Sequence, residues 1–156
     1  MAEKDKHISR LVELIFKLRK KCTLKDLFLV KKVGISYAEY NCLIQFNDAD
    51  TIGMKELAAR LDITPAGVTR IVSSLDERGI VERRIDRKDR REINVVLTRK
   101  GKRIVQDIHQ ASLDLHREIV KHINPKDCES IIQGIEQLTN AVAMWLDRHK
   151  EKELKR

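Results

Sequence analysis

The chain of 156 residues lacks the features that mark membrane, secreted and single-strand-binding proteins. Aromatic residues make up only 4% of it, which argues against a base-stacking platform for single-stranded nucleic acid. No apolar run approaches the roughly 20 residues of a membrane span, and residues 1–10 lack the apolar stretch of a signal peptide. The three cysteines are widely spaced and form no CxxC pair, so we expect free thiols in a reducing cytoplasm.

Common catalytic and nucleotide-binding signatures are missing too: the sequence has no GxGxxG, HExxH or GxSxG, and no GxxxxGK followed by Ser or Thr. We therefore predict neither an enzyme nor a cofactor site. His109 and His116 share a predicted helix face, and Glu118 and His122 stand four residues apart, a spacing that can hold a metal. This set is too sparse for a metal site, so we predict solvated or packed histidines and no metal.

Positive charge is abundant and concentrated in one segment, residues 80–103. Ten Lys or Arg and four Asp or Glu give this segment a net charge of +6, out of +8 for the whole chain. A surface so rich in one sign favours contact with a polyanion.

The segment before it, residues 51–79, has the pattern of a helix, a short turn and a second helix. The second helix begins at Thr64-Pro65, with Thr as N-cap and Pro at the first helical position. Val68, Ile71, Val72 and Leu75 then recur at helical spacing, which places Ala66, Thr69, Arg70, Ser73 and Ser74 on the other face. Two short extended runs follow, residues 80–84 and 92–97, with a polar tip between them. A helix-turn-helix followed by a basic hairpin indicates a winged DNA-binding module.

Long amphipathic helices flank this module on both sides. The first is predicted to bend or break near Cys22-Thr23 and to end at Gly34, and Ser36 to Glu39 form a capping box that starts the next. We predict a mainly α fold with a small β-wing: residues 1–35 and 99–150 are dimerisation helices, 36–98 the winged helix-turn-helix and 151–156 a charged tail. Apolar stripes on the flanking helices favour pairing with a second copy of the chain.

The chain resembles the MarR (multiple antibiotic resistance regulator) family of winged helix-turn-helix transcription factors. The most specific match is the wing, where Asp89-Arg90-Arg91, a short strand, Leu97-Thr98 and Gly101 reproduce the family's D-x-R and L-T-x-x-G signature. The resemblance implies a cytoplasmic homodimer that represses transcription from a palindromic DNA operator. It also implies release from DNA by a small anionic or phenolic ligand, although some members of the family sense oxidants or zinc.

Carried over by position, the resemblance places the N-terminal half of the second helix in the major groove and Arg91, held by a salt bridge to Asp89, in the minor groove. A narrow minor groove focuses negative potential and attracts an inserted Arg. The predicted DNA-binding residues are Thr64, Pro65, Ala66, Thr69, Arg70, Ser73, Arg84, Arg87, Lys88, Asp89, Arg90 and Arg91.

Other interpretations stay open at this point. The wing charges can be an ordinary solvated face, and Arg70 can pair with Glu77 or a phosphate instead of reading a base. Cys22 can be a redox-sensing thiol or an inert one, and Tyr37 and Tyr40 can line an effector pocket or simply pack. In a different class, the winged helix can serve as a protein-docking or RNA-binding module. The charge disfavours docking alone, and A-form RNA has a major groove too narrow for a recognition helix.

Overall fold

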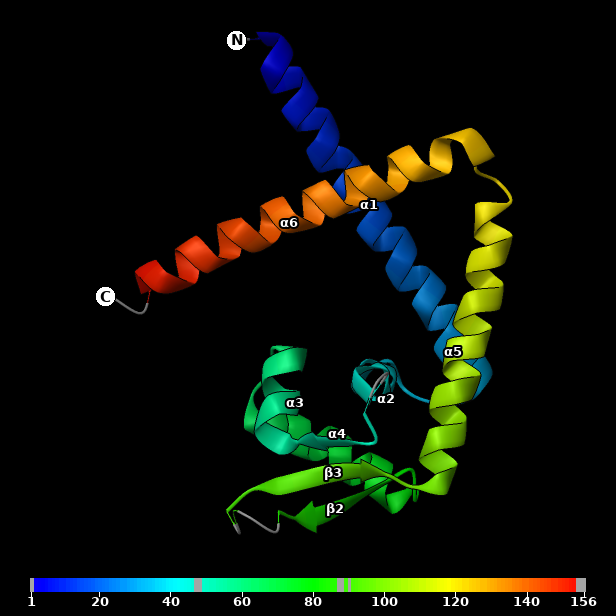
Figure 1. Ribbon diagram of the computed structural model, residues 1–156, viewed down its shortest axis with the longest axis vertical. Helices are drawn as coiled ribbons and strands as arrows, with labels where there is room; N and C mark the ends of the chain where they lie inside the picture. The colour runs from blue at the N-terminus through cyan, green and yellow to red at the C-terminus, as the bar shows by residue number, and fades with distance from the viewer. Residues whose placement is uncertain (1, 47–48, 87–88, 90, 154–156) are drawn as a thin grey trace. The chain divides into compact units, whose positions relative to one another are not determined.

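The computed structural model describes residues 2–46, 49–86, 89 and 91–153. It is mainly helical, with one small antiparallel sheet, and the chain separates into two compact units, Met1–Leu113 and Asp114–Arg156 (Figure 1). No helix of the described residues is both long enough and apolar enough to cross a membrane. The elements in chain order are α1 (Ala2–Val33), α2 (Tyr37–Leu43), the 3-10 turn η1 (Ile44–Phe46), β1 (Thr51–Gly53), α3 (Met54–Leu61), α4 (Pro65–Glu77), β2 (Val81–Ile85), β3 (Ile93–Leu97), α5 (Arg99–Val120), η2 (Pro125–Asp127) and α6 (Cys128–Glu153).

Local signals set the ends of these helices where the sequence predicts them. The Ser36 side chain accepts a hydrogen bond from the Glu39 backbone while the Glu39 side chain accepts one from the Ser36 backbone, so the capping box at the start of α2 is confirmed. Thr64 caps α4 by accepting from the Gly67 backbone N–H at 3.2 Å, with Pro65 in the first turn. Gly34 follows α1 with a positive φ of 74°, which glycine adopts without steric cost.

The predicted break near Cys22-Thr23 is wrong, because α1 runs without interruption from Ala2 to Val33. No Gly or Pro lies within this helix to stop it. The Thr23 hydroxyl donates to the Arg19 carbonyl at 3.1 Å, so its polar group is satisfied inside the helix.

The three strands form a sheet in the order β1-β3-β2, with all neighbours antiparallel. In the hairpin, Val81 pairs with Leu97, Arg83 with Val95 and Ile85 with Ile93, so the odd-numbered residues of β2 and β3 share one face. Val81, Val95 and Leu97 are buried on that face. This register fixes the side of the wing from which each basic residue projects.

One hydrophobic core holds the first unit together. It includes fully buried side chains from α2, α3, α4 and the sheet, and the end of α1 and the first half of α5 also contribute to it. Its largest fully buried members are Leu43, Ile52, Leu57, Leu75 and Ile80. The α1 and α5 segments are therefore packed against the winged module and not merely appended to it.

The signature Thr98 and Gly101 secure the start of α5 against the end of α4. The Thr98 hydroxyl lies 2.7 Å from the Gly79 carbonyl and 3.1 Å from the Ile80 carbonyl, and its oxygen accepts from the Gly101 backbone N–H at 3.1 Å. A Cβ on Gly101 would lie 2.1 Å from the Ile80 carbonyl oxygen, well inside van der Waals contact. The L-T-x-x-G motif is thus a close backbone junction that only glycine allows.

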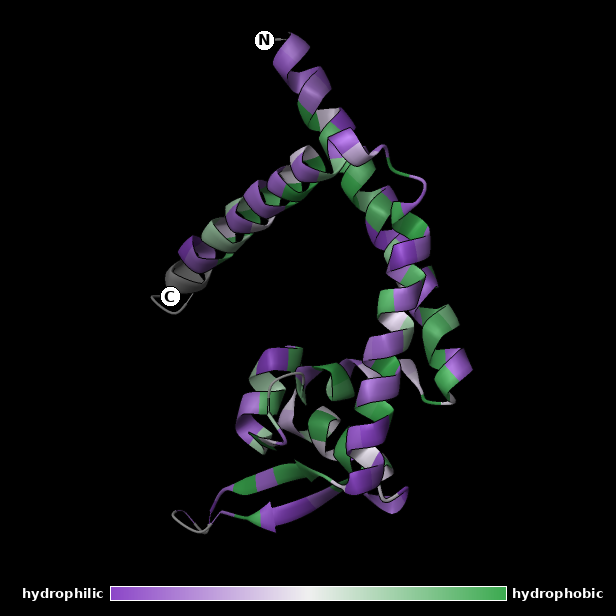
Figure 2. Cartoon of the chain, turned by 45° about the vertical axis from the view of Figure 1, so that its right-hand side comes forward, coloured by the Kyte–Doolittle hydropathy of each residue, from purple (hydrophilic) through white to green (hydrophobic). Residues whose placement is uncertain are grey.

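Away from this core, apolar side chains stay exposed along the long helices. Hydrophobic and hydrophilic residues alternate along α1 and α6 in Figure 2. On α1 the exposed large apolar residues include Leu11, Phe16 and Phe28, which is 68% exposed. On α6 they are Ile131, Ile132, Ile135, Val142, Met144, Trp145 and Leu146.

Candidate nucleic-acid interface

Helix α4 presents one face to the core and the other to solvent. Val68, Val72 and Leu75 are fully buried. Six predicted recognition residues lie at the N-cap or on the opposite face, and all are exposed except Ser73, which is half-buried. These six are Thr64, Pro65, Ala66, Thr69, Arg70 and Ser73.

Thr69 and Arg70 can both offer polar groups to a ligand outside the protein. The Thr69 hydroxyl donates to the Pro65 carbonyl at 2.9 Å, which leaves its oxygen free to accept a hydrogen bond from outside. Arg70 is exposed, and within the described part of the chain it forms no ion pair with Glu77 or another carboxylate. Its guanidinium is therefore available to a phosphate or a base edge.

Arg83 of β2 was not among the predicted DNA-binding residues, yet it reaches across to α4, whereas the predicted Arg84 does not. Its Nη2 donates to the Ser73 hydroxyl and, at 3.4 Å, to the Thr69 carbonyl, and its Nε lies 3.8 Å from Asp76 Oδ2. The alternation of β2 was the available signal, because Arg83 shares the face of buried Val81. Arg84 lies on the other face of the strand.

That other face of β2 carries an ion pair between Arg84 and Glu82. Arg84 is thus separated from the recognition face of α4, while Arg83 contacts it directly. Three further predicted contacts, Arg87, Lys88 and Arg90, lie outside the described residues.

The wing tip is organised by carboxylates that bind backbone N–H groups. Asp86 Oδ1 accepts from the Asp89 backbone N–H at 3.0 Å, and Asp86 Oδ2 accepts from the side-chain Nδ2 of Asn94 at 2.8 Å. Asp89 Oδ1 in turn accepts from the backbone N–H of Arg91 at 2.9 Å. The predicted Asp89–Arg91 salt bridge is absent from the ion pairs of the described residues, because this carboxylate caps the turn instead.

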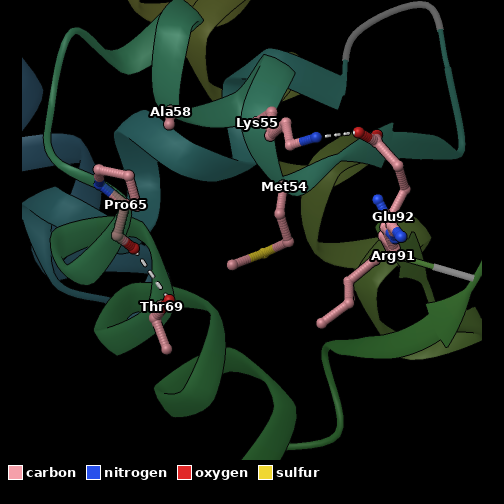
Figure 3. A pocket seen from close by; sticks show the side chains of 8 residues that line it. Met54, Lys55, Ala58, Pro65, Thr69, Arg91 and Glu92 are labelled. Atoms are coloured by element: carbon pink, nitrogen blue, oxygen red, sulfur yellow. Dashed lines mark hydrogen bonds and ion pairs between the residues drawn. The ribbon is translucent and has the colours of Figure 1, made fainter.

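Arg91 lies on the same side of the wing as the start of α4 (Figure 3). It lines a small pocket together with Pro65 and Thr69 of α4 and with Met54 and Ala58 of α3. The structure therefore brings two predicted helix residues and the predicted wing arginine to one surface, although they are up to 26 positions apart in the sequence.

An ion pair between Lys55 of α3 and Glu92 braces the base of the wing (Figure 3). The hydrogen bond to Glu92 and its negative charge raise the pKa of the Lys55 ammonium, which keeps the pair charged. Both partners are accessible to solvent, so the pair orients the wing more than it stabilises the fold.

The thiols differ strongly in environment. Cys42 is fully buried, and burial raises the pKa of its thiol to about 12, so it packs in the core as an unreactive thiol. Cys22 is exposed on α1 and Cys128 is half-buried at the start of α6. Among the described residues, no group of three His, Cys, Asp or Glu side chains is placed to hold a metal.

A capped recognition helix followed by a basic antiparallel hairpin defines a winged helix-turn-helix protein. The family model of the MarR family matches residues 33–92. The HTH-type transcriptional regulator SarZ of Staphylococcus epidermidis is 25% identical over 123 residues, covering 79% of this chain and 80% of SarZ.

Solved structures agree in fold. Apo MarR from Escherichia coli has a TM-score of 0.68 and 27% identity, covering 81% of this chain and 94% of that one. A MarR transcriptional regulator from Methanosarcina mazei has a TM-score of 0.72 and 22% identity, covering 86% and 97%. The winged module of this chain therefore matches the MarR family, and the chain's curated relatives are transcriptional regulators.

Proposed function

We propose that this chain is a transcriptional repressor that binds a palindromic DNA operator as a homodimer in the cytoplasm. The observation that carries the proposal is the common surface of Pro65, Thr69 and Arg91, which joins the recognition helix to the wing. In the proposed complex, α4 occupies the major groove and Arg91 the adjacent minor groove. Asp89 helps by fixing the backbone from which Arg91 projects.

The exposed apolar side chains of α1 and α6 support the homodimer. Large residues such as Phe16 and Trp145, 57% and 58% exposed, are unusual on a monomer surface when they lie beside many others of the same kind. A two-fold dimer places two recognition helices about one helical turn, or ~34 Å, apart, which suits a palindrome. In this proposal the dimerisation helices are residues 1–35 and 99–150, and the DNA-binding module is 36–98.

Light scattering on the DNA-free protein tests the dimer. Trp145→Asp should give monomers or misfolded chain, because an apolar interface does not solvate a carboxylate. Gln133→Glu, an acidic change at another exposed position of the same helix, is the matched control and should keep the dimer mass. A monomeric wild type at micromolar concentration would contradict the symmetric operator.

A second pocket, between α2 and α5, supports the proposal of a small phenolic or anionic effector. Its lining includes Tyr40, Leu43, Ile108 and His109, which offer apolar contact, a phenol and an imidazole. We propose that a ligand there lowers DNA affinity by favouring another arrangement of the helices, which requires different affinities for the two arrangements.

Selection of DNA fragments from a random pool is the decisive test of the function. A two-fold symmetric motif is expected, and its affinity should fall steeply with salt because phosphate contacts release counterions. Binding of RNA or of proteins alone would favour the alternative use of the winged helix. Release by peroxide that Cys22→Ser abolishes, or release by zinc that a chelator reverses, would replace the organic effector by a redox or metal signal.

A further inference from the structure

A buried carboxylate lies near the C-terminal end of the recognition helix α4, opposite the end that carries Thr64, Pro65 and Ala66. Glu39 of α2 is 5% exposed and is the only buried charged side chain among the described residues. Its Oε2 accepts from the Ser36 backbone N–H at 2.8 Å, and its Oε1 accepts from the Ser74 hydroxyl at 2.9 Å. Arg78 Nη1 donates to both oxygens, at 3.0 and 2.9 Å.

The other branch of the same guanidinium binds a different helix end. Arg78 Nη2 donates to the Gly34 carbonyl at 3.0 Å, directly after the last residue of α1. The Arg78 carbonyl, at the C-cap of α4, accepts from the Lys100 ammonium in the first turn of α5 at 2.7 Å. One residue therefore connects the end of α4 to the end of α1, the start of α2 and the start of α5.

The Glu39 carboxylate and the two branches of the Arg78 guanidinium, together called the fork here, form an ion pair in which both carboxylate oxygens are hydrogen-bonded. Burial raises the pKa of the Glu39 carboxyl, but hydrogen bonds from Ser36, Ser74 and Arg78 outweigh burial and hold the pKa below its ordinary value. Stability alone does not call for such a pair, since the Arg78 side chain is 40% exposed and an ion pair that water reaches contributes little to stability. Its geometry supplies direction, because a planar guanidinium binds two partners at fixed angles.

Because the fork lies at the C-terminal end of α4, a small rotation there displaces the N-terminal end of the helix. The helix has 13 residues and is about 20 Å long. Thr64 and Ala66 lie at the opposite end, so a rotation of about 5° at the fork would move them by about 1.7 Å over that length. A shift above about 0.5 Å is enough to spoil a preorganised recognition geometry.

We infer that Glu39 and Arg78 are positioning residues: they set the direction of the recognition helix relative to the end of α1, and so control DNA affinity without touching DNA. The inference rests on the proposed function for its DNA consequence only. The other part of the inference, that the fork sets the direction of α4, concerns the free protein and does not depend on DNA binding.

Arg78→Lys tests the inference, because it keeps the positive charge beside Glu39 but removes the second branch of the fork. Arg60→Lys is the matched control. Arg60 of α3 likewise binds two partners, donating to the Gln45 carbonyl at 3.0 Å and to Glu56 at 2.6 Å, and neither of these partners lies on α4.

The direction of α4 is measured by the electron-spin distance between labels at Lys32→Cys on α1 and Ala66→Cys on α4. Cys22→Ser and Cys128→Ser remove competing thiols, and buried Cys42 stays unlabelled. An excess of unlabelled chain suppresses distances between copies. DNA affinity is measured separately, on unlabelled protein, with the duplex recovered by selection.

We expect Arg78→Lys to broaden or shift the distance distribution and to weaken DNA binding roughly 2- to 30-fold, with helix content unchanged. Arg60→Lys should change neither. Glu39→Gln should act like Arg78→Lys, and the double variant should be little worse than either single one, because all three break one fork.

Three results would overturn the inference. One is an unchanged distance distribution in both single variants. Another is weaker binding with an unchanged distribution and a salt slope reduced by about one, which would place Arg78 on a phosphate. The third is loss of folding in both, which would make the pair a requirement of the fold. If wild type binds no duplex, the proposed function fails while the distance measurement still decides the fork.

Discussion

Gly101→Ala should destabilise the protein through one contact, although alanine favours helices. The added Cβ would lie 2.1 Å from the Ile80 carbonyl oxygen and 3.2 Å from Leu97 Cδ2. The Ile80 carbonyl accepts from the Thr98 backbone N–H at 3.1 Å and lies 3.1 Å from the Thr98 hydroxyl, so it cannot retreat without losing these bonds. Overpacking of this kind costs about 3 kcal/mol. Better helix propensity offsets about 1 kcal/mol, so the net loss is about 2 kcal/mol.

A loss of that size lowers the midpoint of thermal unfolding by roughly 4–8 °C in a chain of this length. Circular dichroism at one fixed protein concentration measures it, since a dimer makes the midpoint concentration-dependent. Gly134→Ala is the matched control: it lies within α6, no atom lies within 4 Å of its added Cβ, and it should stabilise by up to about 1 kcal/mol. If Gly101→Ala unfolds at or above the wild-type temperature, the close junction is not the reason for this glycine.

Three further predictions concern the wing, the cysteines and Glu39. Arg91→Ala should weaken operator binding by about 1–3 kcal/mol in fluorescence anisotropy at fixed salt, and Asp89→Ala by less, because it loosens only the backbone cap; unchanged binding by Arg91→Ala would remove that side chain from the interface. Iodoacetamide with mass spectrometry should modify exposed Cys22 in the native protein but Cys42 only after unfolding, and early modification of Cys42 would contradict its burial. Because folding lowers the pKa of Glu39, its contribution to the free energy of unfolding should be complete above the ordinary pKa of 4.5 and lost as pH falls through the folded value. Glu39→Gln should remove that part of the acid dependence in denaturant titrations, and an identical pH profile would contradict it.

Helix ends could be predicted from the sequence because their causes are local. The Ser36 and Glu39 capping box acts across three residues, and Thr64-Pro65 starts α4 by the N-cap hydroxyl and the fixed φ of proline. The outward face of α4 followed from the spacing of its apolar residues alone. The winged fold could therefore be predicted before any tertiary contact was known.

Contacts across the chain could not be predicted in this way. Arg83 and Arg84 are adjacent and identical in type; alternation along β2 puts Arg83 on the face of Val81, but only its contact with Ser73 shows that this face meets α4. Arg78 and Glu39 are 39 positions apart, and nothing in the local pattern pairs them. The motif Asp89-x-Arg91 suggested a salt bridge, whereas the turn geometry gave the carboxylate a nearer donor in the backbone.

The same contacts limit how an effector could act under the proposed function. Shifting a two-state protein from 99:1 to 1:99 needs about 5.5 kcal/mol of differential binding, or about 2.7 kcal/mol from each of two sites in a dimer. A ligand beside Tyr40 and Ile108 would contact α2 and α5, both of which the Arg78 region ties to the end of α4. A small movement of the Arg78 region would therefore be enough for such a ligand to disturb DNA binding, because the length of α4 makes the displacement larger at Thr64. An effector that releases DNA while leaving the distance between Lys32 and Ala66 unchanged would have to compete for the DNA surface itself.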